Sequence, residues 1–267
     1  MGPGCEQRPR LQSNFCIVML WDIDKQQEDS YLAACKLFAS EDDAFNSFKQ
    51  NGSYNNILEH LSYEDSMFYA DRIDRAYITE ENLQAFKEND AYGSPAKNEY
   101  ESLGDFSPST VRYIKNASDI LRKFGKIDDG CKLVEIGGGY GGLAKTISSV
   151  ISYGSYTLID QPEVNLLSKK YIGKFASINK HHHWMNCYEM DDIYDIDLLI
   201  SNYAVSELSI DSQQEYYDKV IRNADRIYIT YNVPGLQNSF TEILSNDFVL
   251  DSEDDHRDNK IIYGIKK

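Results

Sequence analysis

A chain of 267 residues, of which 42% are hydrophobic, can bury the core of one sizeable domain with a smaller appended part. Its 27 basic and 43 acidic side chains give a net charge of −16, which would repel a polyphosphate and argues against nucleic acid as a partner. No apolar run approaches the roughly 18 residues of a membrane span, and five scattered cysteines without a CxxC pair indicate reduced thiols in a cytoplasmic protein.

The N-terminal part of the chain is predicted to be mostly helical. Residues 1–25 begin with MGPGCEQRPRLQ, and we expect this segment to be poorly structured. Hydrophobic periodicity then predicts a helical region over 26–104, with helices at 26–40, 41–50, 54–61 and 79–89. The segment 89–104 contains Gly, Pro, Asn and Ser, so we expect a loop that ends this region.

Residues 105–267 form the second predicted region, which opens with a helix over 107–125. Ser107 is its expected N-cap, Pro108 lies in the first turn, and Gly125 ends it. Strands and helices then alternate. We expect strands at 131–137, 155–160, near 178–185, 195–202 and 225–232, helices at 142–152, 162–172, 212–224 and 238–246, and two further strands within 247–267.

This order of elements predicts the fold class. Strand–helix alternation is typical of an α/β protein with a parallel sheet and helices on both faces. The last two strands are joined by a short polar turn, so they must run antiparallel. We therefore expect a mostly parallel seven-stranded sheet that ends in an antiparallel C-terminal hairpin, preceded by the helical N-terminal region.

The glycine-rich stretch VEIGGGYGGLA follows the first strand of the sheet, at the turn where such folds bind ligands. Gly137, Gly139 and Gly142 satisfy G-x-G-x-x-G, the dinucleotide fingerprint. Gly137, Gly139 and Gly141, with Glu135 before them, satisfy E-x-G-x-G-x-G, the pattern of S-adenosylmethionine-dependent methyltransferases. The glycines alone leave both cofactors open.

Asp160 ends the next strand, 23 positions after Gly137. A carboxylate at that place can accept hydrogen bonds from both ribose hydroxyls of either cofactor. It could instead cap the helix that begins at Pro162. Asp160 therefore predicts a nucleoside pocket without identifying the cofactor.

Two features favour S-adenosylmethionine. The glycine turn comes only after about 130 residues and the sheet is expected to end in a hairpin, as in Rossmann-like methyltransferases. We also expect no second domain after the sheet, where many dehydrogenases keep catalytic residues. Glu135 can also pair with the ammonium at the methionine end of that cofactor. An NAD(P)-linked oxidoreductase and a non-catalytic scaffold of the same fold stay open as alternatives.

Several blocks of the chain, in order, resemble the sugar O-methyltransferases of bacterial polysaccharide and glycosylated natural-product clusters. The blocks are NDAYGSP (89–95), FSPSTVRYI (106–114), VEIGGGYGGLA (134–144), IDQPEV (159–164), LLISNYAVSEL (198–208), YITYN (228–232) and HRDNKIIYG (256–264). The resemblance implies that residues 105–267 are an S-adenosylmethionine-binding domain with a Rossmann-like methyltransferase fold, and that 26–104 line the acceptor side. It also implies methyl transfer to a sugar hydroxyl of a glycan or glycosylated metabolite. Gln161, where we expect an apolar residue such as leucine, and the short N-terminal region depart from that pattern.

Methylation of a sugar hydroxyl requires in-line positioning and either a general base or a metal, because the hydroxyl is a poor nucleophile. Glu207, after the fourth strand, is our first candidate for the base, with bracing of its loop as the alternative. His256, in the hairpin turn, is the second candidate because of its suitable pKa, although histidines in such turns are commonly just exposed.

Further contacts are expected at the carboxyl ends of the strands and on the helix before the sheet. The expected cofactor contacts are Gln161, Cys187, Asn202 and Arg112, and the expected acceptor contacts are Tyr203, Tyr231 and Asn232. Cys187 follows the third strand, where methyltransferases bind adenine. Arg112 can pair with the cofactor carboxylate, or can be a surface arginine.

The stretch HHHWMNCYEMDD raises the question of a metal. Alternate residues of a strand share a face, so at most His181 and His183 could bind one ion. Asp191 and Asp192 are nearby hard ligands, but no third ligand can be placed with them. We expect no metal site here and leave Mg²⁺ open as a requirement of the reaction.

Overall fold

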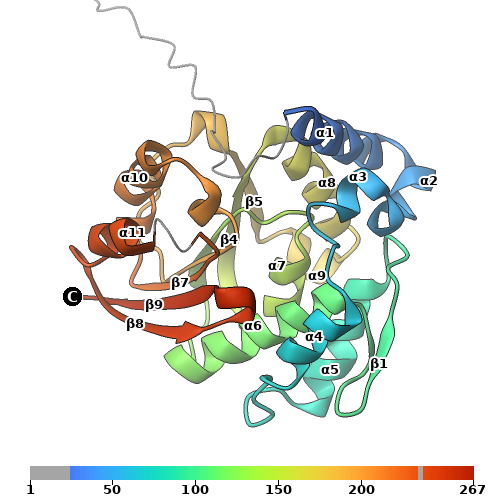
Figure 1. The fold of residues 1–267 in the computed structure, drawn as a ribbon, viewed down its shortest axis with the longest axis horizontal. Coiled ribbons are helices and arrows are strands. Elements are labelled where there is room, and N and C mark those ends of the chain that lie inside the picture. Colours follow the sequence, from blue (N-terminus) through green and yellow to red (C-terminus); the bar gives the residue numbers. More distant parts are fainter. Residues whose placement is uncertain (1–24, 234–236) are drawn as a thin grey trace, which may run out of the picture.

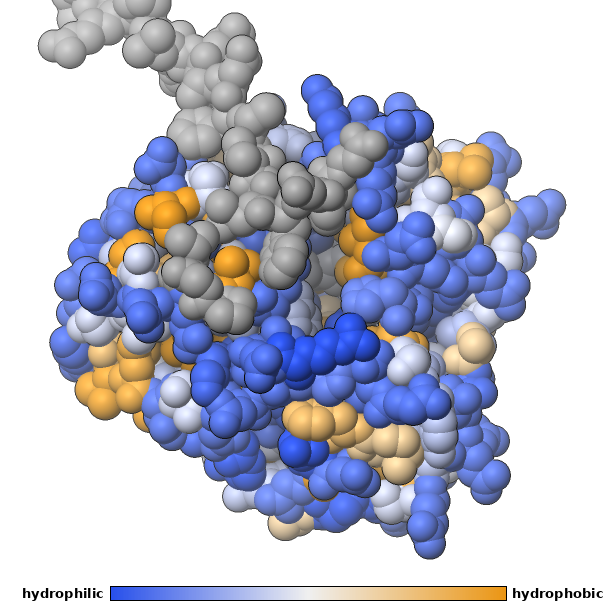
Figure 2. Space-filling view, in the orientation of Figure 1, coloured by the Kyte–Doolittle hydropathy of each residue, from blue (hydrophilic) through white to orange (hydrophobic). Residues whose placement is uncertain are grey.

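The computed structural model describes residues 25–233 and 237–267. The segment predicted to be poorly structured, residues 1–25, lies outside the described residues except for Lys25, the first residue of α1. Within the described part, no helix has both the length and the apolar character needed to cross a membrane. The face seen in Figure 2 is mainly hydrophilic, with its apolar residues in small separate patches.

A seven-stranded sheet forms the centre of the molecule (Figure 1). Its strands are β3 (Cys131–Ile136), β4 (Tyr153–Asp160), β5 (His182–Asn186), β6 (Leu198–Asn202), β7 (Arg226–Tyr231), β8 (Phe248–Asp254) and β9 (Lys260–Lys266). They lie in the order β5-β4-β3-β6-β7-β9-β8. The first five pair in parallel, and β9 runs antiparallel to both β7 and β8. The predicted mostly parallel sheet with a C-terminal hairpin is confirmed.

The central strands are nearly continuous apolar runs because helices cover both faces of the sheet. The helices of this part are α6 (Pro108–Phe124), α7 (Gly142–Ile147), α8 (Pro162–Ile172), α9 (Ala176–Asn179), α10 (Ile210–Lys219) and α11 (Gln237–Leu244). In Figure 1, α10 and α11 cover one face and α6, α7 and α8 cover the other. α6 begins and ends as predicted, since Ser107 accepts a hydrogen bond from the Thr110 N–H and Gly125 takes a φ of 67°.

The N-terminal region packs beside the sheet (Figure 1). Its elements are α1 (Lys25–Ser40), α2 (Asp42–Phe45), α3 (Gly52–Asn55), α4 (Tyr63–Ala70), α5 (Glu80–Phe86), β1 (Asn98–Tyr100) and β2 (Gly104–Phe106). The helix expected at 54–61 is wrong in its bounds: α3 begins at Gly52, where the Asn51 side chain caps it, and ends at Asn55. The expected loop at 89–104 contains a short antiparallel hairpin, β1–β2, because Tyr100 and Phe106 are buried in a local core.

The helical region and the sheet share one hydrophobic core. α1 packs against α8, and Tyr31 and Phe38 belong to the same buried cluster as Leu133 and Leu167. The boundary at residue 105 stays a prediction. This packing places the N-terminal helices over the edge of the sheet where the parallel strands end. The turn η6 (His256–Asp258), between β8 and β9, reaches the same edge, because β9 begins opposite the end of β7.

Candidate active site

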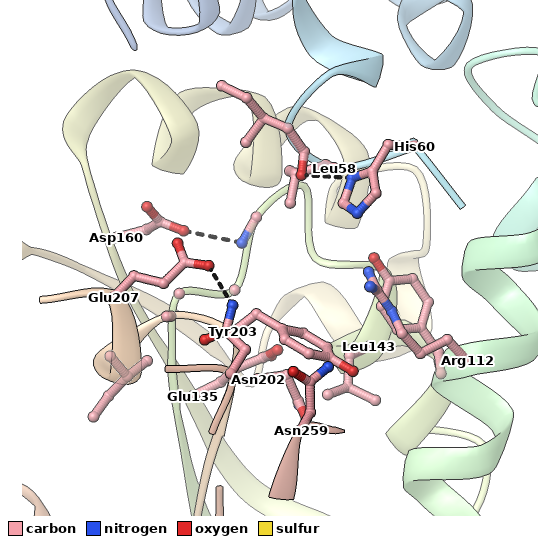
Figure 3. A pocket seen from close by; sticks show the side chains of 18 of the residues that line it. Leu58, His60, Arg112, Glu135, Leu143, Asp160, Asn202, Tyr203, Glu207 and Asn259 are labelled. Carbon is pink, nitrogen blue, oxygen red and sulfur yellow. Dashed lines mark hydrogen bonds between the residues drawn. The ribbon is translucent and has the colours of Figure 1, made fainter. Parts of the chain in front are cut away.

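A cavity of about 600 Å³ opens at the carboxyl ends of the parallel strands (Figure 3). It is bounded by the loop after β3, the ends of β4 and β6, helix α6, the N-terminal helices and the turn η6. Of the predicted site residues, all except Gly141 and Tyr231 line it. The cavity therefore gathers predicted residues that are spread over nearly 150 positions of the sequence, from Arg112 to His256.

The loop after β3 requires its glycines. Gly137 and Gly139 have positive φ angles of 76° and 53°, a region that other residues rarely adopt. A Cβ on Gly137 would lie 2.1 Å from the Cβ of Ala204. Gly141, with a φ of 91°, is the N-cap of α7 and packs against Ile172, so its role here is in packing.

Asp160 connects the end of β4 to the glycine loop. Its Oδ2 accepts a hydrogen bond of 2.9 Å from the Gly139 N–H, and its Oδ1 accepts one of 2.8 Å from the Gln161 N–H. Burial raises the pKa of Asp160 to about 6, although these two bonds act against the shift. The N-cap of α8 is Gln161, which makes no side-chain cap. Asp160 thus orders the loop and presents carboxylate lone pairs to the cavity.

Glu135 lies at the base of the cavity, at the end of β3. It is only 3% exposed, and the Tyr156 hydroxyl donates a hydrogen bond of 2.8 Å to its Oε2. Burial raises the pKa of Glu135 to about 8, with the bond from Tyr156 opposing. A cationic ligand group beside it would favour the ionised form.

Two side chains that face the cavity carry hydrogen-bond donors with no acceptor among the described residues. Arg112 is 8% exposed, and its guanidinium lies 5.1 Å from the ring centroid of Tyr203, yet it makes no hydrogen bond or ion pair within the described residues. Asn202 accepts a hydrogen bond from the Thr230 hydroxyl at 2.6 Å, but its buried Nδ2 has no acceptor in the described part of the chain. Because buried donors are rarely left unpaired, both groups point to an acidic ligand group.

Glu207 lies in the turn after β6 and is held by Asn232, the residue after β7. The Asn232 Nδ2 donates to Glu207 Oε1 at 2.8 Å, and the Ser206 hydroxyl donates to Asn232 Oδ1 at 2.6 Å. Burial raises the pKa of Glu207, and the bond from Asn232 lowers it. One carboxylate oxygen is therefore already engaged in bracing the loop (Figure 3).

His256 is fixed in place. Its Nε2 lies 3.2 Å from Oδ1 of Asp65 on α4, and its ring packs against Phe68 and Tyr69 with centroids 5.0 Å and 5.7 Å away. Arg257 donates to both Asp65 oxygens, at 2.8 Å and 2.9 Å. The side chain is thus held between the hairpin tip and the N-terminal helices.

Tyr203 and Tyr231, both expected to contact the acceptor, differ in position. Tyr203 lines the cavity with a φ of 56°, donates to Asp255 at 2.9 Å, and has its hydroxyl 3.1 Å from that of Tyr69. Tyr231 is buried on the opposite face of β7 and stacks on Phe240 of α11. Alternation along the strand therefore turns Tyr231 away from the cavity that Asn232 lines.

Other lining residues were missed by sequence reasoning. They come mostly from the N-terminal helices and the hairpin tip: Tyr31, Leu58, His60, Tyr69, Arg257, Asp258 and Asn259. The last three fall in the block HRDNKIIYG and could have been found there. No signal in a single sequence marks the first four.

Two histidines of the histidine-rich stretch, His181 and His182, make contacts within the fold. No group of three or more His, Cys, Asp or Glu side chains within 25–233 and 237–267 is arranged to hold a metal ion. His182 stacks on Tyr156, with Nδ1 3.0 Å from the Ile178 carbonyl oxygen, and burial lowers its pKa to about 4. His181 lies 3.0 Å from the Gly154 carbonyl oxygen.

The strand order, the antiparallel hairpin and the glycine turn after β3 define a Rossmann-like methyltransferase fold. No protein-family model and no curated protein matches the chain. Similar solved structures include a precorrin-6y C5,15-methyltransferase from Geobacter metallireducens, with 14% identity over 65% of this chain and 94% of the other and a TM-score of 0.45. An S-adenosylmethionine-dependent methyltransferase from Aquifex aeolicus has 14% identity over 57% and 89% of the two chains and a TM-score of 0.46. Thermoplasma acidophilum protein 1320 has 16% identity over 71% and 98%, with a TM-score of 0.45.

Proposed function

We propose that this protein is an S-adenosylmethionine-dependent O-methyltransferase that acts on a sugar hydroxyl of a glycan or glycosylated metabolite. The observation that carries the proposal is the order in which three charged side chains lie along one cavity. Asp160 lies on one side of the glycine loop and Arg112 on the other, with Glu135 between them at the base (Figure 3). These groups match, in order, the hydroxyls of a ribose, an ammonium and a carboxylate.

The residues present suit that cofactor at each end. The ribose hydroxyls would donate to Asp160, and the adenine would lie near Cys187, which lines the cavity after β5. The carboxylate at the methionine end would accept hydrogen bonds from Arg112 and from Nδ2 of Asn202, which has no acceptor in the part of the chain that the structure describes. Its ammonium would pair with ionised Glu135.

A dinucleotide suits the site less well. In dinucleotide-binding folds the pyrophosphate contacts the exposed N-terminus of the helix after the glycine loop. Here that end of α7 is buried: a Cβ on Gly142 would lie 2.4 Å from the Tyr140 hydroxyl, and one on Gly141 would lie 3.0 Å from Ile172. This burial disfavours the oxidoreductase alternative.

The opposite end of the cavity suits a polyhydroxyl acceptor. Asp160 ends β4 and η6 precedes β9, with β3, β6 and β7 between them in the sheet order. At about 4.8 Å per strand these ends lie roughly 20 Å apart along the sheet edge, which leaves room for donor and acceptor together. Tyr69, Arg257 and Asn259 line the η6 end and offer aromatic faces and hydrogen-bonding groups that a sugar can use. The net charge of −16 disfavours a nucleic-acid acceptor.

His256 fits the role of general base better than Glu207, because one oxygen of Glu207 is already bonded to Asn232. When bound, S-adenosylmethionine supplies a methyl group from a sulfonium. The leaving group is a neutral thioether, so it needs no charge stabilisation from the protein. His256 would take the proton of the attacking hydroxyl as the new carbon–oxygen bond forms and the carbon–sulfur bond breaks. Tyr69 and Tyr203 would hold the acceptor in line with the methyl group.

Because the pKa of Glu135 is raised, we expect cofactor binding to depend on pH. Its pKa of about 8 means that it is mainly protonated at pH 7, whereas the cofactor ammonium favours the carboxylate. Binding at pH 7 should therefore release a proton from Glu135, and affinity should rise as pH increases toward 8. Calorimetry at pH 7 in two buffers of different ionisation enthalpy measures this release. Glu135→Gln should remove it, and equal proton release by the variant and the wild type would contradict this assignment.

The proposed reaction is tested by supplying S-adenosylmethionine with an isotopically labelled methyl group and a panel of sugars, nucleotide sugars and glycosides. Mass spectrometry should locate the label on a sugar oxygen. Gly137→Val, whose side chain would collide with Ala204, is the inactive control. Transfer only to nitrogen or carbon acceptors in a parallel panel would contradict the proposal.

A further inference from the structure

Asp65 occupies the contact between the N-terminal helices and the C-terminal hairpin. It comes from α4, and its side chain is 10% exposed. On the hairpin side, Nε2 of His256 lies 3.2 Å from Oδ1, and the Arg257 guanidinium bonds to both carboxylate oxygens. On its own helix, the N–H and hydroxyl of Ser62 donate to Oδ2 at 3.2 Å and 3.0 Å. The carboxylate is thus fixed from both sides.

We propose that Asp65 is a positioning residue for His256: it sets the tautomer and orientation of the imidazole and stabilises the imidazolium that forms when the acceptor gives up its proton. This inference rests on the proposed function, in which His256 is the general base. Because Asp65 Oδ1 lies 3.2 Å from Nε2, the negative charge of the carboxylate would keep the proton of the neutral ring on Nε2. The lone pair of the base is then on Nδ1, which makes no hydrogen bond within the described residues.

The backbone of the hairpin tip supports this role. Arg257 and Asp258 are consecutive non-glycine residues with φ angles of 55° and 64°. Such conformations are strained in L-residues and persist where surrounding contacts determine them, commonly at functional sites. Here the determining contacts are the pairs that Arg257 and His256 make with Asp65.

The charges around Asp65 favour its ionised form. Burial raises its pKa, but the hydrogen bonds from Ser62 and Arg257 outweigh this and lower the pKa overall. Other ionisable groups near the imidazole are Tyr69 of α4, His60 at the cavity lining, and Asp255 and Asp258 beside His256 in the chain. Among the described residues, Asp65 is the carboxylate that pairs directly with the ring.

A purely structural alternative is that Asp65 only caps α4, through its capping box with Ser62. The two roles separate in a pair of variants. Asp65→Asn removes the charge that fixes the imidazole, whereas Ser62→Ala removes the cap and keeps the pair with His256. Thermal melting shows whether each variant is folded, and calorimetry measures its affinity for S-adenosylmethionine.

The kinetic experiment compares kcat in the wild type and the two variants. Asp65→Asn should lower kcat by roughly 100-fold or more with cofactor affinity unchanged. Ser62→Ala should keep the wild-type kcat. A wild-type kcat in Asp65→Asn, or an equal loss in Ser62→Ala, would overturn the proposal.

A second measurement does not depend on the reaction. Nuclear magnetic resonance of ¹⁵N-labelled histidine should find His256 as the Nε2–H tautomer in the wild type and as a mixture in Asp65→Asn. A mixture in the wild type would overturn the positioning role. Absence of cofactor binding and methyl transfer in the wild type would instead overturn the proposed function, so the two failures are distinguishable.

Discussion

Replacing His256 with alanine should lower kcat for methyl transfer by about 10²- to 10⁴-fold, the contribution typical of a general base. Affinity for S-adenosylmethionine should stay at the wild-type value, because His256 lies at the η6 end of the cavity, away from the glycine loop and Asp160. Steady-state kinetics with a saturating acceptor, alongside calorimetric titration of the cofactor, measures both quantities.

His183→Ala is a matched control, since His183 is exposed on β5 and does not line the cavity. It should leave both quantities unchanged. His60→Ala tests the other histidine of the cavity lining. Full activity in His256→Ala with a large loss in His60→Ala would transfer the role of base to His60.

Replacing Asp160 with alanine should weaken S-adenosylmethionine binding on the order of 100-fold. A hydrogen bond to a charged group contributes about 1.5–3 kcal/mol, so the loss of two such bonds from the ribose hydroxyls, even at about 1.5 kcal/mol each, accounts for a change of this size. The substitution also removes the acceptor of the Gly139 N–H, which orders the glycine loop. Isothermal titration calorimetry of the variant measures the change.

Asp160→Asn keeps one acceptor oxygen and should lose less affinity than the alanine variant. Asp191→Ala, an exposed carboxylate outside the cavity, should bind like the wild type. Wild-type affinity in Asp160→Ala would mean that the ribose does not contact this residue.

The sheet could be predicted from sequence because its signals are local. Apolar runs such as LVEI and LLIS, separated by helical patterns, mark β3 and β6 as buried parallel strands. The elements that were wrong in the N-terminal region are short, and tertiary contacts determine them. The β1–β2 hairpin forms because Tyr100 and Phe106 are buried in a local core, and strands of three residues are too short to show a hydrophobic periodicity in the sequence.

The site was predictable where it follows strand ends and was missed where distant segments complete it. Glu135, Asp160 and Asn202 each end or lie near the end of a strand, and parallel strands bring those ends to one edge. Asp65 lies 192 residues from Arg257 in the chain, so only the folded structure reveals that pair. The residues of α4 match no sequence motif, and Asp65 acquires its proposed role only because α4 packs against the hairpin tip.

Titration of the wild-type protein with S-adenosylmethionine, S-adenosylhomocysteine and NAD in a calorimeter tests the central claim most directly. We predict micromolar binding of the two adenosyl ligands and none of NAD, because the groups along the cavity match an amino-acid nucleoside and the start of α7 is closed to a pyrophosphate. Preferential binding of NAD, or no binding of any of the three, would contradict the assignment of this cavity.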